Sequence, residues 1–209
     1  MSIVIFVRHG ENDYIKNGVL AGRLPGIHLN EKGREQAKKV AEQLSHFPIN
    51  AIYSSPLERT METAEPIASL SKLKIVVREA LLEIDYGEWQ GQELNKLRDN
   101  RSWEIIQNSP SKFCFPGGES FIEAQHRIYN ELNGLLKFHH KRDIIVVVSH
   151  SDVIKLAICY YLGIALDKFQ RITISPASST TLAIDKKKCV LLNLNLPYEL
   201  TPPKTLVVL

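Results

Sequence analysis

The stretch SIVIFVRHGEN, residues 2–12, decides how this chain is expected to fold. Residues 3–7 are a run of β-branched and aromatic side chains, which is too short to span a membrane and is typical of a fully buried strand in a parallel sheet. Arg8, His9 and Gly10 follow directly. Ligand sites in open α/β sheets lie beyond the carboxyl ends of strands. A cation beside an imidazole at this place therefore indicates a site for a phosphoryl group.

The bulk composition excludes several classes of protein. Of the 209 residues, 44% are hydrophobic and 23% are charged, which is ordinary for a soluble globular chain. The formal net charge of +3 would help to attract a small anionic substrate, but it does not indicate nucleic-acid binding. Cys114, Cys159 and Cys189 are odd in number and widely spaced, which argues against a disulfide framework and for a reducing compartment. With no apolar run of spanning length, we expect a cytoplasmic protein without membrane segments.

Strands and helices are expected to alternate along the chain. A polar, glycine-containing loop is expected over residues 13–29. Further strands are expected at residues 50–53, 74–77 and 143–148, and a hairpin at residues 180–184 and 190–194. Helices are expected after Asn30, from Pro56, from Glu119 to near His139, and over residues 154–161. This order predicts an α/β fold, a three-layer α/β/α sandwich with a mostly parallel central sheet. We expect one domain, residues 1–209, with an insert at about residues 91–118 that forms a lid or pocket wall.

The chemistry-bearing side chains recur at the ends of the expected strands. His150 follows the strand at residues 143–148 as His9 follows the first strand, and Arg59 lies in the first turn of a helix that follows another strand. A carboxylate-rich segment, residues 79–89, contains Glu83. Two histidines, two arginines and a carboxylate are thus predicted to meet at one edge of the sheet.

The motifs that carry these residues resemble the histidine phosphatase superfamily, the phosphoglycerate-mutase-like proteins. They occur in the family's order over nearly all of the first 155 residues. The matching segments are VRHGE (7–11), LNEKGREQA (29–37), SSPLERT (54–60), EIDYGEWQG (83–91), FPGGES (115–120) and VSH (148–150). A lone RHG is a weak signal, whereas six segments in register are a specific one.

The resemblance implies roles for particular positions. His9 is expected to be the nucleophile that takes the phosphoryl group, and Glu83 the proton donor. Arg8, Arg59 and His150 are expected to form the phosphate pocket with them. The expected substrate-binding residues are Arg8, Asn12, Gly22, Arg23, Arg59, Glu83, His150 and Ser151. No metal and no cofactor are expected, because the arginines supply the positive charge.

Elementary electrostatics agrees with these roles. Two guanidiniums can grip phosphoryl oxygens, and they lower the pKa of a neighbouring histidine such as His9, which leaves a lone pair free for attack. A phosphate dianion nearby and partial burial would raise the pKa of Glu83, so that the carboxyl arrives protonated.

Several alternatives stay open at this point. Asp85 or Glu88 could replace Glu83 as the acid, and Arg23 is either a solvated loop residue or a ligand for a second anionic group of the substrate. Many relatives have an asparagine where this chain has Ile15, so that either of two nearby asparagines, Asn12 and Asn17, could contact the phosphate. Other features are expected to be structural: the helix-end His139 and His140, the solvated Lys186 to Lys188, and the local core residues Trp103, Phe113 and Phe115. The apolar tail, residues 196–209, could dock on its own domain or on a partner subunit.

The function expected from this pattern is metal-independent hydrolysis of a small phosphorylated metabolite through a phosphohistidine. The alternatives are a cofactor-dependent phosphoglycerate mutase and a weakly catalytic module that binds phosphorylated ligands. The modest insert favours hydrolysis, because mutases of the family usually carry larger insertions. The expected partners are the small phosphorylated substrate and, as an open alternative, a second copy of the chain in a homodimer.

Overall fold

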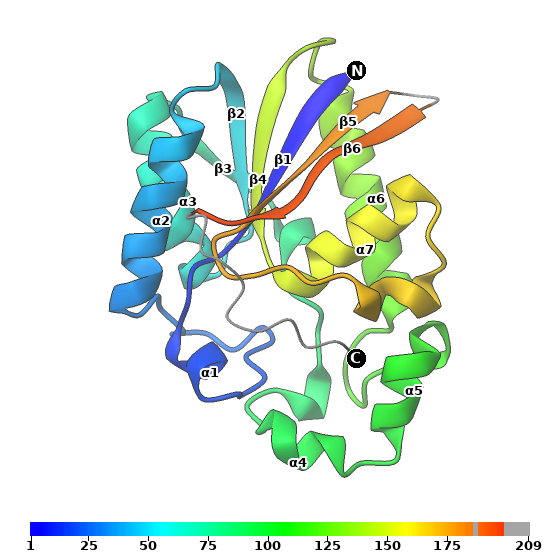
Figure 1. Ribbon diagram of the computed structural model, residues 1–209. Helices are drawn as coiled ribbons and strands as arrows, with labels where there is room; N and C mark the ends of the chain where they lie inside the picture. The colour runs from blue at the N-terminus through cyan, green and yellow to red at the C-terminus, as the bar shows by residue number, and fades with distance from the viewer. Residues whose placement is uncertain (186–187, 199–209) are drawn as a thin grey trace.

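The computed structural model describes residues 1–185 and 188–198 (Figure 1). Within these residues, six strands form one sheet in the order β3-β2-β4-β1-β5-β6. The strands are β1 (Ser2–Arg8), β2 (Ile49–Ser54), β3 (Ile75–Val77), β4 (Ile144–Ser149), β5 (Ser179–Asp185) and β6 (Lys188–Leu196). The first four are parallel to one another, and β5 and β6 form the antiparallel hairpin at the edge. The mostly parallel sheet predicted from the sequence is confirmed.

Helices cover both faces of the sheet (Figure 1). The side chains of β1 and β4 alternate between two buried clusters: Phe6 and Val147 lie in one, Val7 and Val148 in the other. The cluster around Phe6 packs against α6 (Phe121–Leu136) and α7 (Ser151–Leu162). The cluster around Val7 packs against α2 (Glu31–Leu44) and α3 (Glu58–Ser71). The predicted three layers are therefore present.

Local capping explains where the helices begin. Asn30 accepts a hydrogen bond from the Gly33 amide at 2.8 Å, which starts α2 at the residue after the predicted cap. The helix expected from Glu119 begins two residues later, because Ser120 and Glu123 form a capping box. That helix also ends at Leu136, before the two histidines. The helix expected from Pro56 likewise begins late, at the first residue of α3.

The connections contain more helix than the sequence indicated. The expected loop over residues 13–29 begins with a short helix, α1 (Asp13–Lys16). The expected insert carries α4 (Leu94–Arg98), α5 (Ser102–Asn108) and the 3-10 helix η3 (Pro110–Lys112). Its aromatic residues Phe113 and Phe115 are buried in the core beside Trp89, as the local-core interpretation predicted. The other 3-10 helices are η1 (Glu79–Leu81), η2 (Gly87–Trp89) and η4 (Leu166–Arg171).

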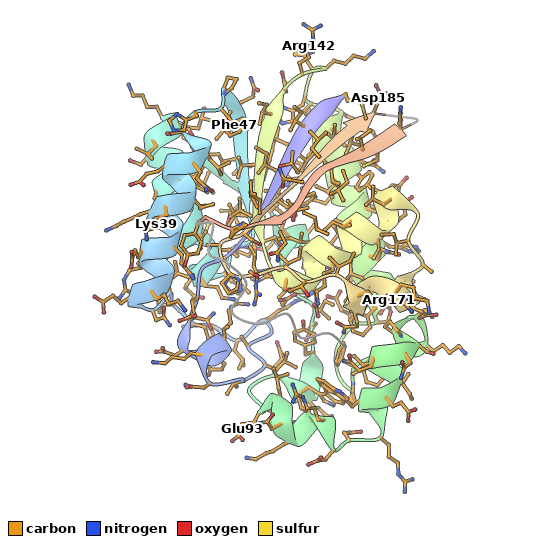
Figure 2. All side chains as sticks on the ribbon, viewed as in Figure 1. Lys39, Phe47, Glu93, Arg142, Arg171 and Asp185 are labelled. Atoms are coloured by element: carbon orange, nitrogen blue, oxygen red, sulfur yellow. The ribbon has the colours of Figure 1, made fainter. Side chains whose placement is uncertain are left out.

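The two ends of the sheet have different surroundings. Arg142 precedes the amino end of β4, and Glu93, at the start of α4, lies at the opposite end of the molecule (Figure 2). The carboxyl ends of the parallel strands face α1 and α4 (Figure 1). Of the hairpin tip and the tail, residues 186–187 and 199–209 lie outside the described part. Among the described residues, no helix has both the length and the apolar character that a membrane span requires.

Candidate active site

The parallel pairing of β1 with β4 brings the two predicted histidines together. Arg8 is paired with Ser149 in the sheet register, and the His9 amide donates to the Ser149 carbonyl at 3.0 Å. His9 and His150 follow these residues directly, and their ring centroids lie 5.3 Å apart with the planes at 64°. Both rings are buried, with 4% and 0% exposure. Two residues 141 positions apart in the sequence thus form one centre.

Hydrogen bonding fixes the tautomer of His9. Its Nδ1 lies 2.8 Å from the carbonyl oxygen of Gly10, which can only accept, so Nδ1 carries the proton. The lone pair is then on Nε2, the nitrogen free to attack. Burial, followed by the charges of Arg59 and Arg8, holds the pKa of His9 well below its usual value. The predicted direction is correct, although burial and not the arginines is its first cause.

Arg59 is a buried cation with incomplete hydrogen bonding. The first turn of α3 places it beneath the histidines, where Nη2 donates to the Gly22 carbonyl at 2.7 Å and to Nδ1 of His150 at 3.3 Å. Arg8 donates from Nη1 to the Ile174 carbonyl at 2.6 Å. Among the described residues, Nε of Arg8 and both Nε and Nη1 of Arg59 are buried without a partner. Such groups are costly unless a ligand accepts from them, and a planar fork suits a phosphoryl group.

The orientation of His150 depends on a residue that the sequence analysis did not assign. Because Arg59 can only donate, Nδ1 of His150 accepts, and Nε2 carries the proton toward the Ser55 hydroxyl at 2.9 Å. The pKa of His150 is held well below its usual value by burial, then by Arg59 and His9. Ser55 lies in the SSPLERT segment, so the motif contained the signal even though the role was not assigned.

Glu83 is the buried carboxyl of the acidic segment. It is 8% exposed, and its Oε1 accepts from the Ile84 amide at 3.1 Å. Burial and then the negative charge of Asp152 raise its pKa to about 7, against the opposing charges of Arg59 and Arg8. A carboxyl with this pKa can both give and take a proton near neutrality.

The two alternative acids are placed differently. Asp85 accepts from the Gly87 amide at 3.0 Å and lies 3.5 Å from a guanidinium nitrogen of Arg23, and Glu88 is exposed. Of the three carboxyls, Glu83 is the one buried beside the arginines.

A tight backbone crossing holds the segment that carries Glu83. Gly87 has φ of +52°, and a Cβ there would lie 2.1 Å from the carbonyl oxygen of Pro116. The Glu88 amide donates to that same carbonyl at 2.9 Å, and the Glu119 amide donates to the Asp85 carbonyl at 2.9 Å. Only glycine fits this crossing. This close approach and these hydrogen bonds tie the EIDYGEWQG segment to the FPGGES segment.

The remaining predicted residues have mixed positions. Asn12 is fully buried at the N-cap of α1, where its Oδ1 accepts from the Ile15 amide, and its Nδ2 is another buried donor without a partner in the described residues. Gly22 holds Arg59 through its carbonyl, with φ of +54°. Ser151 is the first residue of α7, next to His150.

Arg23 has protein partners that the sequence did not predict. Its guanidinium donates to the Glu83 carbonyl at 2.8 Å and to the Glu119 carboxylate at 2.8 Å. The interpretation of Arg23 as a solvated loop residue is wrong, because it is tied to the segment that carries the acid. A contact between Arg23 and substrate stays a prediction.

Comparisons with known proteins identify relatives of this chain. The chain is 34% identical over 205 residues to phosphoserine phosphatase 1 of Hydrogenobacter thermophilus. The aligned region covers 94% of this chain and 93% of the relative. It is 29% identical to the 2,3-bisphosphoglycerate-dependent phosphoglycerate mutase of Thermoplasma acidophilum, with 88% of each chain covered. A solved phosphoserine phosphatase of Entamoeba histolytica in complex with 3-phosphoglyceric acid superposes with a TM-score of 0.83 at 27% identity, with 93% and 97% of the two chains covered.

The family expected from the sequence motifs is confirmed. The model of the histidine phosphatase superfamily (branch 1) matches residues 4–197, which include both histidines and both arginines of the centre. The chain therefore belongs to the histidine phosphatase superfamily.

Proposed function

We propose that this protein hydrolyses small phosphate monoesters through a phosphohistidine formed on His9. The observation that carries the proposal is a neutral, buried imidazole beside three buried guanidinium nitrogens that have no partner in the described residues. A phosphoryl group supplies the oxygens that these donors lack. Its transfer depends on positioning and charge stabilisation, which this arrangement offers.

The reaction has two balanced steps. Nε2 of His9 attacks phosphorus, the bond from phosphorus to the ester oxygen breaks, and Glu83 gives its proton to the departing oxygen. Water then attacks the phosphohistidine, Glu83 takes a proton from that water, and the phosphorus–nitrogen bond breaks. Phosphate leaves, and His9 and Glu83 return to their starting states. A pKa of about 7 suits Glu83 to both proton transfers.

The arginines carry the charge of the transferred group. Arg8 and Arg59 bind the phosphoryl oxygens, and His150 belongs to the pocket by accepting from Nη2 of Arg59 and orienting that guanidinium. Asn12, whose Nδ2 is a buried donor without a partner in the described residues, is the asparagine that we assign to this pocket. Gly22 acts by holding Arg59, and we assign Ser151, the first residue of α7, as a substrate contact because it follows His150 directly. No metal ion enters these steps, and an assay with a chelator tests this feature.

Hydrolysis and transfer to a second acceptor differ in the second step. The similarity to a phosphoserine phosphatase and to a phosphoglycerate mutase makes phosphoserine and 3-phosphoglycerate the first esters to test. We favour hydrolysis because the insert of residues 91–118 contains only short helices, and we assign it as a wall of the substrate pocket. With 3-phosphoglycerate, free phosphate indicates hydrolysis and 2-phosphoglycerate indicates a mutase.

The deciding experiment is a panel of phosphoesters assayed with EDTA present. We expect turnover of a small ester that EDTA does not change, with release of free phosphate. Activity that disappears on chelation contradicts charge stabilisation by arginines alone. Tight phosphate binding without turnover of any ester would instead favour a phospho-ligand-binding module.

Two further features belong to this proposal. We place the protein in the cytoplasm, because its three cysteines are free among the described residues and their spacing suits a reducing compartment. A homodimer is a further proposal, and measurement of the mass in solution tests it.

A further inference from the structure

Glu119 is the centre of a charged cluster next to the acid-bearing segment. Its Oε1 accepts from Nη2 of Arg23 at 2.8 Å, from Nη2 of Arg127 at 2.6 Å and from the Asp85 amide at 3.0 Å. The carboxylate side chain is 17% exposed, and the two arginines are 28% and 21% exposed. Two guanidiniums that come from distant parts of the chain thus share one carboxylate.

The same guanidiniums also donate to the backbone around Glu83. Arg127 donates from Nη1 to the carbonyls of Ala80 at 2.7 Å and Leu82 at 3.0 Å, and its Nη2 lies 3.5 Å from the Glu83 carbonyl. Arg23 donates from Nε to that Glu83 carbonyl at 2.8 Å. The peptide of the proton donor is therefore held both from the loop that carries Arg23 and from α6, which carries Arg127.

A proton donor in an irregular segment needs such support. Glu83 lies between η1 and η2, where no helix or strand ladder fixes its backbone. A small displacement of a catalytic group costs much of its contribution to the rate, so groups that hold it in place are part of the machinery.

We propose that Glu119 and Arg127 are positioning residues for the proton donor Glu83. Glu119 holds the guanidiniums of Arg127 and Arg23. These donate to the carbonyls of Ala80, Leu82 and Glu83, and so set where the Glu83 carboxyl meets the leaving oxygen. This inference rests on the proposed function. It gives Arg23 a role in the site that needs no direct contact with substrate.

Leaving-group dependence separates positioning of an acid from general stability. An alkyl phosphate needs its leaving oxygen protonated, whereas p-nitrophenyl phosphate releases a phenolate that is stable without a proton. The experiment measures kcat/KM for β-glycerophosphate and p-nitrophenyl phosphate with wild type, Glu119→Gln and Arg127→Lys. Because kcat/KM reports the first phosphoryl transfer, it excludes the later water step from the comparison.

We expect a selective loss. For the alkyl ester, kcat/KM should fall at least about tenfold, and for the nitrophenyl ester less than about threefold, within the range that general acid catalysis supplies. Gln125→Ala is the matched control, since Gln125 lies on the same helix and donates to the Leu156 carbonyl at 3.2 Å, away from Glu83. It should change both esters equally and little.

Equal losses for the two esters, or no loss in either variant, overturn the inference while the proposed function stands. Wild type that hydrolyses neither ester, nor any other in the panel, removes the proposed function and this inference with it. Thermal unfolding of each variant shows that it is folded at the assay temperature. Should Glu119→Gln fail that check, Arg127→Lys, which keeps the charge and loses the fork, carries the decision alone.

Discussion

The fold treats two groups of arginines near Glu83 in opposite ways. Arg8 and Arg59 stand beside the histidines with buried N–H groups that have no partner in the described residues. Arg23 and Arg127, in contrast, are each paired with Glu119 and with backbone carbonyls. The first pair, Arg8 and Arg59, therefore has guanidinium donors that can still bind a ligand. The donors of the second pair, Arg23 and Arg127, are bound to the protein.

The difference indicates which cations serve function. A buried charge without compensation lowers stability, whereas a paired and hydrogen-bonded one is tolerated. A chain that keeps Arg59 1% exposed and under-bonded therefore bears a cost that an anionic ligand would relieve. Arg23 and Arg127 have acceptors within the protein and so carry no uncompensated buried charge. Their hydrogen bonds hold the backbone around Glu83.

The largest expected effect comes from removing the proposed nucleophile, which the first pair of arginines surrounds. His9→Ala should lower turnover by at least about 10³-fold. Among the described residues of this centre, no other side chain combines a free imidazole lone pair with two neighbouring guanidiniums. It should also abolish covalent labelling by substrate phosphate, measured by a denaturing quench at alkaline pH, where a phosphorus–nitrogen bond survives, followed by intact mass without acid. His126→Ala, at an exposed histidine on α6, serves as the control. Labelling that persists in the His9 variant would move the nucleophile to another residue.

A second test exchanges one arginine from each group for a neutral side chain of similar length. Arg59→Met should lower kcat/KM by about 10²–10³-fold, since it removes preorganised donors to the phosphoryl group. Its free energy of unfolding should stay equal or rise, because an under-bonded buried charge is gone.

Arg127→Met should lower the free energy of unfolding by roughly 1–3 kcal/mol, because the Glu119 carboxylate loses one of its two guanidinium donors and the carbonyls of Ala80 and Leu82 lose theirs. Urea unfolding at neutral pH measures both values. Equal destabilisation by the two substitutions would remove the distinction between the groups.

The part of this site that the sequence predicted is the part encoded by contiguous residues. A buried strand followed by histidine occurs at His9 and at His150, and the parallel sheet needs only to pair the strands for the rings to meet. Arg59 was predictable for the same reason, as a first-turn residue after a strand. The α/β/α layers follow from the alternation of strand and helix.

Relations across long separations were not predictable from one sequence. Ser55 and His150 are 95 positions apart, and their contact depends on the register in which β2 pairs with β4. The Glu119 cluster likewise depends on how α6 lies against the acidic segment. The error in the predicted start of α6 has a local cause. An acidic residue such as Glu119 is typical of a first helical turn, but here the Ser120 hydroxyl caps the helix, which begins at the next residue.

A third test uses the stability cost of the buried acid. The pKa of Glu83 is about 7 in the folded protein against 4.5 in its ordinary state, so folding disfavours the ionised form. Wild type should therefore lose stability as pH rises from about 4.5 to about 7, and Glu83→Gln should not, with a difference between them that grows to roughly 2–3 kcal/mol. Urea unfolding from pH 4.5 to 8 measures this difference. Glu88→Gln, at an exposed carboxylate of the same segment, is the control, and a difference that does not change with pH contradicts the raised pKa.

The smallest expected effect concerns the charge that raises this pKa. Asp152 accepts from the Tyr86 hydroxyl at 3.0 Å and pairs with Lys155 at 3.0 Å, and its charge acts on Glu83 from within α7. Asp152→Asn should lower the pKa of Glu83, so that the protonated acid is lost at lower pH. The alkaline limb of kcat/KM for an alkyl phosphate should then shift to lower pH, with a rate roughly two- to fivefold below wild type above neutrality.

Tyr86→Phe separates that charge effect from a loosened hydrogen bond. It removes the donor at 3.0 Å but leaves the Asp152 carboxylate in place, so it should leave the limb where wild type has it. If both substitutions moved the limb equally, the carboxylate would act through the geometry of Tyr86. A shift confined to Asp152→Asn means instead that a like charge keeps the acid protonated against two under-bonded arginines, which is how one buried carboxyl can serve as donor beside a cationic pocket.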